Sequence, residues 1–326
     1  MKQILIIYPL SNRHIGLWKD LETDERVFLR GSGRRQLNRF YSFLLRCLFH
    51  FKIKFIQTKF NYKRFEYHDL FKLIRKVNYL LIIDGTLNQL NISDLEKCRK
   101  LNPKLEISLY LINSINAHSL VMRNVKPKIN LFRWNNVYTF DPEDAKQFGY
   151  KYLGFNYYSK PVGRLDVTEM NNVYFVGGLK GGRDELVYSV YKYLKTNGIK
   201  TMYDINVMDS KVEKIVDSNI NYFNTWIPYS YVINKILKSK CILEIMQQGQ
   251  YGATLRYFEA VTMNKKLLTN NPNIVNFPFY NPKWMKIFNV LEDIDLNWLA
   301  SDENVDYQYN NEFSPAHLVD YIITQK

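Results

Sequence analysis

Residues 247–259 are the part of the chain whose side chains are best placed to do chemistry. Arg256 and Glu259 stand three residues apart in a predicted short helix (254–263), so both lie on one face of that helix. The helix follows a predicted buried strand (241–246) and a polar loop, an order that directs free backbone N–H groups and the positive helix end toward an anion. A cation near the helix start suits a phosphate, and a carboxylate one turn later suits the paired hydroxyls of a ribose or a sugar. A surface Arg–Glu pair on an ordinary βα unit has the same spacing, so spacing alone leaves both interpretations open.

A second phosphate-type signal lies at residues 177–182, between a predicted strand and a predicted helix. Glycines there let the backbone approach phosphate oxygens closely, and Lys180 inside the loop and Arg183 at its exit would neutralise them. The spacing of Gly177, Gly178 and the later glycines matches neither a Walker loop nor G-x-G-x-x-G. The pattern by itself therefore fits a flexible turn as well as a phosphate loop.

The segment around Arg256 resembles the donor-nucleotide site of the GT-B glycosyltransferases, in particular the capsule and lipopolysaccharide-core subgroup. The subgroup's pattern Q-x-x-Q-x-G-x-T-x-R-x-x-E-A stands here as Gln247, Gln250, Gly252, Thr254, Arg256, Glu259 and Ala260. The resemblance implies a glycosyltransferase that moves a sugar from a nucleotide-sugar to a membrane-associated glycan or lipid-linked acceptor in bacterial surface polysaccharide synthesis. It also implies that the loop at 177–183 helps to hold the donor diphosphate. Either Gln248 or Gln250 would contact the sugar through a neutral amide, or the sugar is bound differently.

One position departs from the pattern of many retaining GT-B enzymes, which carry two glutamates spaced E-x7-E. Glu259 would be the second of these, but Tyr251 stands at the first position. The stereochemical outcome of transfer is therefore not assigned.

Two residues of the first half are candidate general bases that would accept a proton from an acceptor hydroxyl. His14 follows the first predicted strand and Asp84 ends the strand predicted at 79–83, so both are expected near a cleft between two domains. A loop histidine or a strand-end aspartate is also a common turn or capping residue, and that alternative stays open for both.

The sequence favours a site that works without a metal or another cofactor. Asp293 and Asp295 match the D-x-D signature of metal-binding GT-A enzymes, but they stand late in the chain in a short acidic stretch typical of a solvated turn. Fixed cations near a departing diphosphate stabilise its developing charge without a metal. We therefore expect the nucleotide-sugar to be the co-substrate, with no essential metal.

The positive charge of the chain is concentrated in one block. The formal net charge is +14, and residues 26–65 hold eleven Lys or Arg and no acidic residue. On the helix predicted at 34–49, Arg35, Arg39 and Arg46 share a basic stripe opposite the apolar side. Such a block suits an anionic partner: a lipid headgroup surface, a nucleic acid or a phosphorylated substrate.

These charges leave more than one class of protein open. Aromatic residues alternate with the cations, as in single-strand binders, but no nucleic-acid-binding motif accompanies them, so we expect no nucleic acid partner. A GT-B-shaped transferase of a non-sugar group is a further alternative. No apolar run approaches the ~18–20 residues of a membrane span, and the first residues look like a strand rather than a secretory signal. The expected location is the cytoplasmic face of the membrane, bound peripherally.

The elements that position these residues alternate between strand and helix, which predicts α/β architecture with parallel sheets. Together with the resemblance, this predicts a GT-B-like fold of two Rossmann-like domains whose parallel sheets face a central cleft. The first domain, 1–160, is the expected acceptor domain, and 170–310 is the expected donor domain. A last helix, about 314–326, is expected to pack back on the first domain. The predicted strands are 3–8, 52–57, 79–83, 106–112, 136–140, 173–176, 201–205, 241–246 and 266–269, and the predicted helices are 34–49, 67–76, 93–101, 142–148, 184–196, 229–238 and 254–263.

Overall fold

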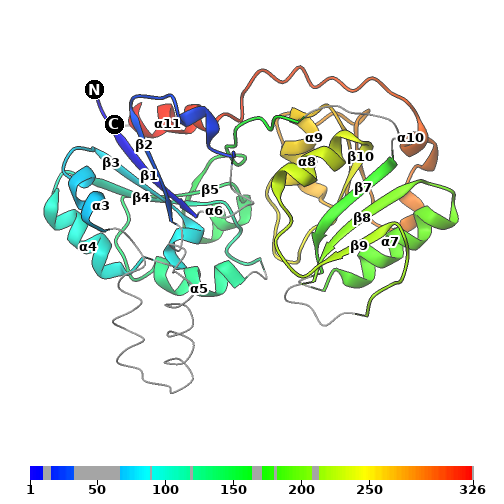
Figure 1. Cartoon of the computed structure of the whole chain (residues 1–326), viewed down its shortest axis with the longest axis horizontal. Coiled ribbons are helices and arrows are strands. Elements are labelled where there is room, and N and C mark those ends of the chain that lie inside the picture. Colours follow the sequence, from blue (N-terminus) through cyan, green and yellow to red (C-terminus); the bar gives the residue numbers. More distant parts are fainter. Residues whose placement is uncertain are drawn as a thin grey trace, which may run out of the picture.

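The computed structural model describes residues 1–9, 16–32, 67–88, 90–117, 120–163, 171–179, 182–207 and 213–324. Within these ranges the chain forms two α/β domains side by side, each built on a six-stranded sheet (Figure 1). All the described strand pairings are parallel. The predicted α/β fold with two parallel sheets is therefore confirmed.

The first sheet has the strand order β2-β1-β3-β4-β5-β6. Successive residues of β1 point to opposite faces: Leu5 and Ile7 pack with α3, α4 and α5, whereas Ile4 and Ile6 belong to the cluster that contains α11. The elements are β1 (Ile4–Pro9), η1 (Lys19–Leu21), β2 (Val27–Ser32), α3 (Tyr67–Ile74), β3 (Tyr79–Ile83), η2 (Asp84–Asn88), α4 (Ile92–Leu101), β4 (Glu106–Leu111), α5 (Leu120–Ile129), β5 (Asn136–Thr139), α6 (Pro142–Phe148) and β6 (Lys151–Tyr152).

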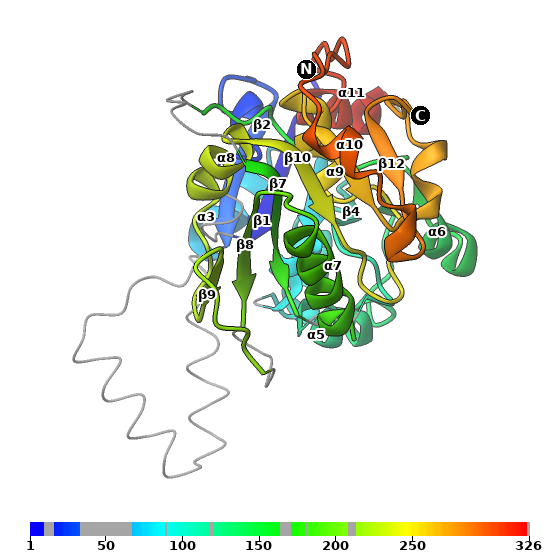
Figure 2. The ribbon, with the colours of Figure 1, turned by 90° about the vertical axis from the view of Figure 1, so that its right-hand side faces the viewer.

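The second sheet has the strand order β12-β11-β10-β7-β8-β9. Helix α7 covers one face and helices α8 and α9 the other, an arrangement visible in the turned view (Figure 2). The elements are β7 (Asn171–Gly178), α7 (Asp184–Thr196), β8 (Thr201–Asn206), β9 (Ile220–Phe223), α8 (Tyr229–Leu237), β10 (Ser239–Glu244), α9 (Leu255–Thr262), β11 (Lys266–Thr269), η3 (Pro272–Asn276), β12 (Met285–Ile287), η4 (Leu291–Asp293), α10 (Leu296–Ala300) and α11 (Pro315–Thr324).

The element boundaries show where local signals were sufficient. Asp141 caps α6 by accepting from Glu143 N and Asp144 N, Pro142 opens the helix, and Gly149 ends it at φ 69°, as its sequence predicts. Helix α4 begins one residue before its predicted start at 93, and its capping box is formed by Asn91 and Asp94. Helix α5 was missed, since Pro127 interrupts its helical pattern. The elements predicted at 34–49 and 52–57 lie outside the described residues.

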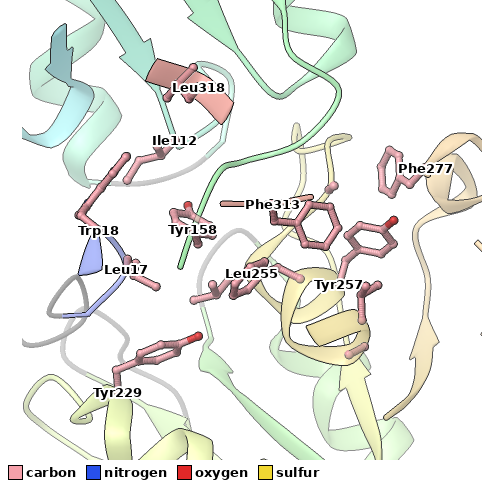
Figure 3. Close-up of a cluster of buried hydrophobic side chains, with 14 of the residues drawn as sticks. Leu17, Trp18, Ile112, Tyr158, Tyr229, Leu255, Tyr257, Phe277, Phe313 and Leu318 are labelled. Carbon is pink, nitrogen blue, oxygen red and sulfur yellow. The ribbon is translucent and has the colours of Figure 1, made fainter. Parts of the chain in front are cut away.

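One apolar cluster runs from the first domain into the second. The ring of Tyr158, in the segment between the sheets, lies 6.5 Å from that of Trp18 and 5.4 Å from that of Phe258 in α9. The Phe313 ring, just before α11, lies 4.8 Å from that of Phe155 and 6.0 Å from that of Tyr257. Figure 3 shows Tyr158 with Trp18 on one side and the second-domain side chains on the other. This shared core fixes the two domains together at one end of their interface.

The last helix returns to the first domain, where it lies beside the N-terminal strand (Figure 1). The Arg26 guanidinium pairs with Asp320 at 2.7 Å, and Lys2 Nζ donates to the Ile323 carbonyl at 3.0 Å. The Tyr321 ring meets that of Tyr138 edge-on at 6.0 Å.

Candidate functional site

The strand order of the second sheet creates a switch point between β7 and β10. From there the chain continues outward through β8 and β9 on one side and through β11 and β12 on the other. In open α/β sheets, ligands bind outside the carboxyl ends of the strands at such a point. A cavity lies there, and both domains line it; its lining includes Ile112, Asn113, Phe140, Asn156, Tyr158, Gly177, Gly178, Arg183, Asn206, Trp226, Tyr229, Glu244, Gln247, Gln250, Thr254 and Arg256.

The glycine end of β7 shapes one part of the cavity around Arg183. Arg183 Nε donates to the Gly178 carbonyl and Nη1 to the Ile245 carbonyl, both at 2.6 Å, so the guanidinium bridges the ends of β7 and β10. A Cβ on Gly177 would lie 2.8 Å from Arg183 Nη2. Glycine at this position is therefore required for the guanidinium to lie across the switch point.

The start of α9 supplies the second cation. Thr254 caps the helix by accepting from Arg256 N at 3.0 Å, which fixes the first turn. Arg256 lines the cavity, and its Nη1 lies 2.5 Å from Glu259 Oε2. Glu259 is fully buried beside Tyr229 and does not line the cavity. The sequence correctly brings the pair to one helix face, but the structure presents the cation and covers the carboxylate.

Glu244, at the end of β10, is a cavity residue that the sequence reasoning missed. The Thr254 hydroxyl donates to its Oε1 and the Thr269 hydroxyl to its Oε2 at 2.5 Å. Burial raises the pKa of this carboxyl, while both hydroxyls and the nearby cations Arg256 and Arg183 act to lower it. A glutamate within the apolar run of a predicted buried strand was the signal that could have identified it.

The loop that follows β10 is less available to a phosphate than its sequence suggests. Gln247 and Gln250 line the cavity, but Gln248 is exposed away from it. The Tyr251 and Gly252 N–H groups donate to Asp141 Oδ2 of the first domain, at 2.9 and 3.1 Å. Of the backbone N–H groups expected to meet an anion, those of Tyr251 and Gly252 are therefore not free.

The first-domain wall is organised by Asp84, one of the two candidate bases. Its carboxylate is fully buried and accepts from Ile112 N and Asn113 N, at 3.0 and 2.9 Å, and from Asn113 Nδ2 at 3.0 Å. Burial raises the pKa of Asp84 to about 6, although these hydrogen bonds act to lower it. Asp84 does not line the cavity, whereas Asn113 does. The position of Asp84 is that of a group that fixes the backbone and orients Asn113.

Several predicted residues lie outside the described residues. These are the candidate base His14, the loop lysine Lys180, and the basic stripe Arg35, Arg39 and Arg46. Their roles remain predictions.

The described part of the chain holds no group of three or more His, Cys, Asp or Glu side chains arranged to bind a metal. Asp295 accepts from Trp298 N at the start of α10 and pairs with Lys286 at 2.6 Å. Asp293 accepts from Asn289 N and Val290 N. The D-x-D residues are thus local caps. Among the described helices, none has the length and apolarity needed to cross a membrane.

Comparison with known proteins shows the fold. No family model matches the chain, and no curated protein sequence does. An α-glucosyltransferase in complex with UDP and a 13-mer DNA has a TM-score of 0.59 over 100% of both chains at 14% identity. An α-glucosyltransferase in complex with UDP-glucose and DNA containing an abasic site gives 0.59 over 99% of both chains at 13% identity. A further α-glucosyltransferase structure with UDP gives 0.51 over 86% of this chain and 83% of that chain, at 12% identity.

These likenesses define the class of fold: a GT-B arrangement of two Rossmann-like domains. At such identities they establish the architecture alone. The narrower resemblance to the capsule and lipopolysaccharide-core subgroup remains a prediction.

Proposed function

We propose that this chain is a glycosyltransferase that takes a sugar from a nucleoside diphosphate bound at the β7–β10 switch point. The observation that carries the proposal is the convergence of Arg183 and Arg256 on one cavity, beside the glycine end of β7 and the start of α9. This is the chemistry that a departing diphosphate requires. Support comes from the shared fold of α-glucosyltransferases crystallised with UDP or UDP-glucose.

The proposed division of labour follows from the positions of the side chains. Arg183 and Arg256, with Lys180 as a predicted third cation, hold the diphosphate and stabilise the charge that develops on it as the bond to the sugar breaks. Gln250 contacts the sugar through its amide, and Glu259 binds the ribose once the diphosphate has drawn Arg256 toward the cavity. Because cations are already fixed at the leaving group, we propose that transfer needs no metal.

A donor screen tests the class. UDP, GDP, dTDP and CMP would be added at about a hundred times the dissociation constant of a good ligand, where binding stabilises the folded state by about 2.7 kcal/mol and raises Tm by several degrees. We expect one nucleotide to do so, and turnover of the matching nucleotide-sugar to persist in EDTA. Indifference to all four nucleotides would overturn the proposal, and loss of turnover in EDTA would overturn its metal-free form.

For the acceptor, we propose a glycan or lipid-linked substrate at an anionic membrane surface, reached by peripheral binding on the cytoplasmic side. The basis is the cationic block 26–65. Each basic residue near such a surface contributes about 1 kcal/mol. Reversing Arg35, Arg39 and Arg46 to Glu should therefore abolish co-sedimentation with phosphatidylglycerol vesicles while leaving nucleotide binding unchanged. Unchanged sedimentation would remove the membrane claim and leave the donor claim intact.

DNA is a second candidate acceptor, and two observations favour it. The net charge is +14, and two of the compared α-glucosyltransferase structures contain DNA. These two observations count against the expectation from the sequence that the protein has no nucleic acid partner. Filter binding of a DNA duplex, measured beside vesicle binding at the same salt concentration, separates the two acceptors. Tight, salt-dependent duplex binding with sugar transfer to DNA would favour this candidate.

A further inference from the structure

Asp141 connects the two domains at the edge of the candidate donor site. It belongs to the first domain, where Oδ1 accepts from Glu143 N at 3.0 Å and from Asp144 N at 3.5 Å and so caps α6. Its other oxygen, Oδ2, accepts from Tyr251 N and Gly252 N of the second domain. One carboxylate therefore serves a helix of one domain with one oxygen and a loop of the other domain with the second.

The loop 249–252 meets the first domain through its backbone. A Cβ on Gly252 would lie 2.6 Å from the Phe140 ring and 2.8 Å from the Phe140 carbonyl oxygen. Gly249 adopts φ 78°, and a Cβ there would lie 2.5 Å from the Asn116 carbonyl oxygen. Both glycines are needed for this approach, and Asp141 provides the polar bonds that hold it.

Asp141 is well supported from behind. It is 1% exposed, and the Ser114 hydroxyl donates to the same Oδ2 that the loop uses. The neighbouring Asp144 accepts from Ile115 N at 2.8 Å, which fixes the segment that carries Ser114. The acceptor oxygen is therefore held rigidly at the domain interface.

We propose that Asp141 is a positioning residue that holds the loop 247–252 in the conformation that binds the nucleotide-sugar. Gln247, Gln250 and Thr254 line the cavity on either side of the two N–H donors that Asp141 accepts. Without this contact, the loop would lose its support from the first domain. The donor site is thus completed by a first-domain residue that does not line it. The part of this proposal that concerns the donor rests on the proposed function.

The substitution Asp141→Asn separates the two jobs of the side chain. Asparagine caps helices about as well as aspartate, so its oxygen keeps the α6 cap. Its NH2 group takes the place of Oδ2 and cannot accept hydrogen bonds, so the N–H groups of Tyr251 and Gly252 lose their acceptor. We expect hydrogen exchange of the peptide covering 247–254 to accelerate at least tenfold and the Kd for UDP, or for the nucleotide found in the donor screen, to rise at least tenfold. Exchange in α6 should stay unchanged.

A matched control and a second variant keep the test decisive. Asp94→Asn alters a capping-box carboxylate of the same domain, at α4, and should change neither quantity. Gly252→Ala leaves Asp141 intact but forces the loop away from Phe140, and it should reproduce both effects. If the 247–254 peptide exchanges at the wild-type rate in both Asp141→Asn and Gly252→Ala, Asp141 does not hold the loop 247–252 in place, and the proposal is overturned. If exchange accelerates in both variants while nucleotide affinity is unchanged, the positioning role is overturned. Failure of the wild type to bind any nucleotide would instead overturn the proposed function, and the exchange result would stand by itself.

Discussion

The two walls of the cavity use charged residues in opposite ways. On the second-domain wall, the guanidinium groups of Arg183 and Arg256 line the cavity. Behind the first-domain wall, the carboxylates of Asp84, Asp141 and Asp144 are buried and accept backbone N–H groups. Charges of the second wall are placed to meet a ligand, whereas those of the first wall hold backbone segments in position. The difference supports the proposal that the second domain binds the anionic part of a substrate while the first supplies a rigid frame.

The carboxylates of the second domain fit the same view. Glu259 lies beneath Arg256, and Glu244 accepts the hydroxyls of Thr254 and Thr269. Glu259 orients Arg256 through their ion pair, and Glu244 lies close enough to Arg256 and Arg183 to offset part of their charge.

The largest expected effect comes from removing a cation of the second wall. Arg256→Ala should lower kcat/KM for the nucleotide-sugar about a hundredfold, because losing one preorganised donor to a developing oxyanion costs about 3 kcal/mol. The fold should persist with reduced stability, because the substitution takes the Arg256 guanidinium away from the fully buried Glu259 carboxylate. Steady-state turnover and circular dichroism measure the two quantities.

Arg99→Ala is the matched control for this substitution. Arg99 belongs to α4 of the first domain, where it stacks on the Phe132 ring at 4.6 Å, away from the cavity lining. It should leave turnover unchanged. Near-normal turnover of Arg256→Ala would show that the cations of the second-domain wall are not needed for the reaction, and the contrast between the two walls would then have no functional meaning.

The contrast also explains what the sequence could and could not predict. Strand–helix alternation predicts both parallel sheets, and the spacing of Arg256 and Glu259 places them correctly on one helix face. Long-range partners have no local signal: nothing near Gly252 indicates that its N–H bonds a carboxylate more than a hundred positions earlier. The position of Asp84 at a strand end makes it a candidate base, but the local sequence does not show its burial, which depends on β4 and the loop that follows β4.

The second prediction concerns the buried carboxylates of the first wall. Burial, with a smaller contribution from the neighbouring Asp141, raises the pKa of Asp144 from 3.8 to about 6, although the hydrogen bond from Ile115 N–H and the charge of Lys126 act to lower it. A raised folded-state pKa means that the contribution of Asp144 to stability is present below about pH 4 and lost as pH rises through about 6. Asp144→Asn stays neutral and keeps an acceptor for Ile115 N–H. It should therefore gain up to about 3 kcal/mol over the wild type between pH 4 and pH 7.

Urea unfolding of both proteins at the two pH values measures this gain. Glu143→Gln removes the same charge from the same helical turn at an exposed position, so it should not change the pH dependence appreciably. If the free energy of unfolding of Asp144→Asn and of the wild type depended equally on pH, burial would not disfavour the ionised form of the Asp144 carboxyl.

The smallest expected effect comes from the covered carboxylate of the second wall, Glu259. Glu259→Gln should weaken UDP binding about tenfold, the loss of one charge-assisted hydrogen bond. Two causes would give this result: loss of a ribose contact, or misplacement of Arg256. Measuring the binding of UDP and of 2′,3′-dideoxy-UDP to both proteins separates these causes. If Glu259 contacts the ribose hydroxyls, the wild type should bind UDP more tightly than the dideoxy analogue, whereas Glu259→Gln should bind the two equally well. If both proteins preferred UDP over the dideoxy analogue to the same extent, the role of Glu259 would be to position Arg256. The second-domain wall would then bind the diphosphate without a contact between Glu259 and the ribose.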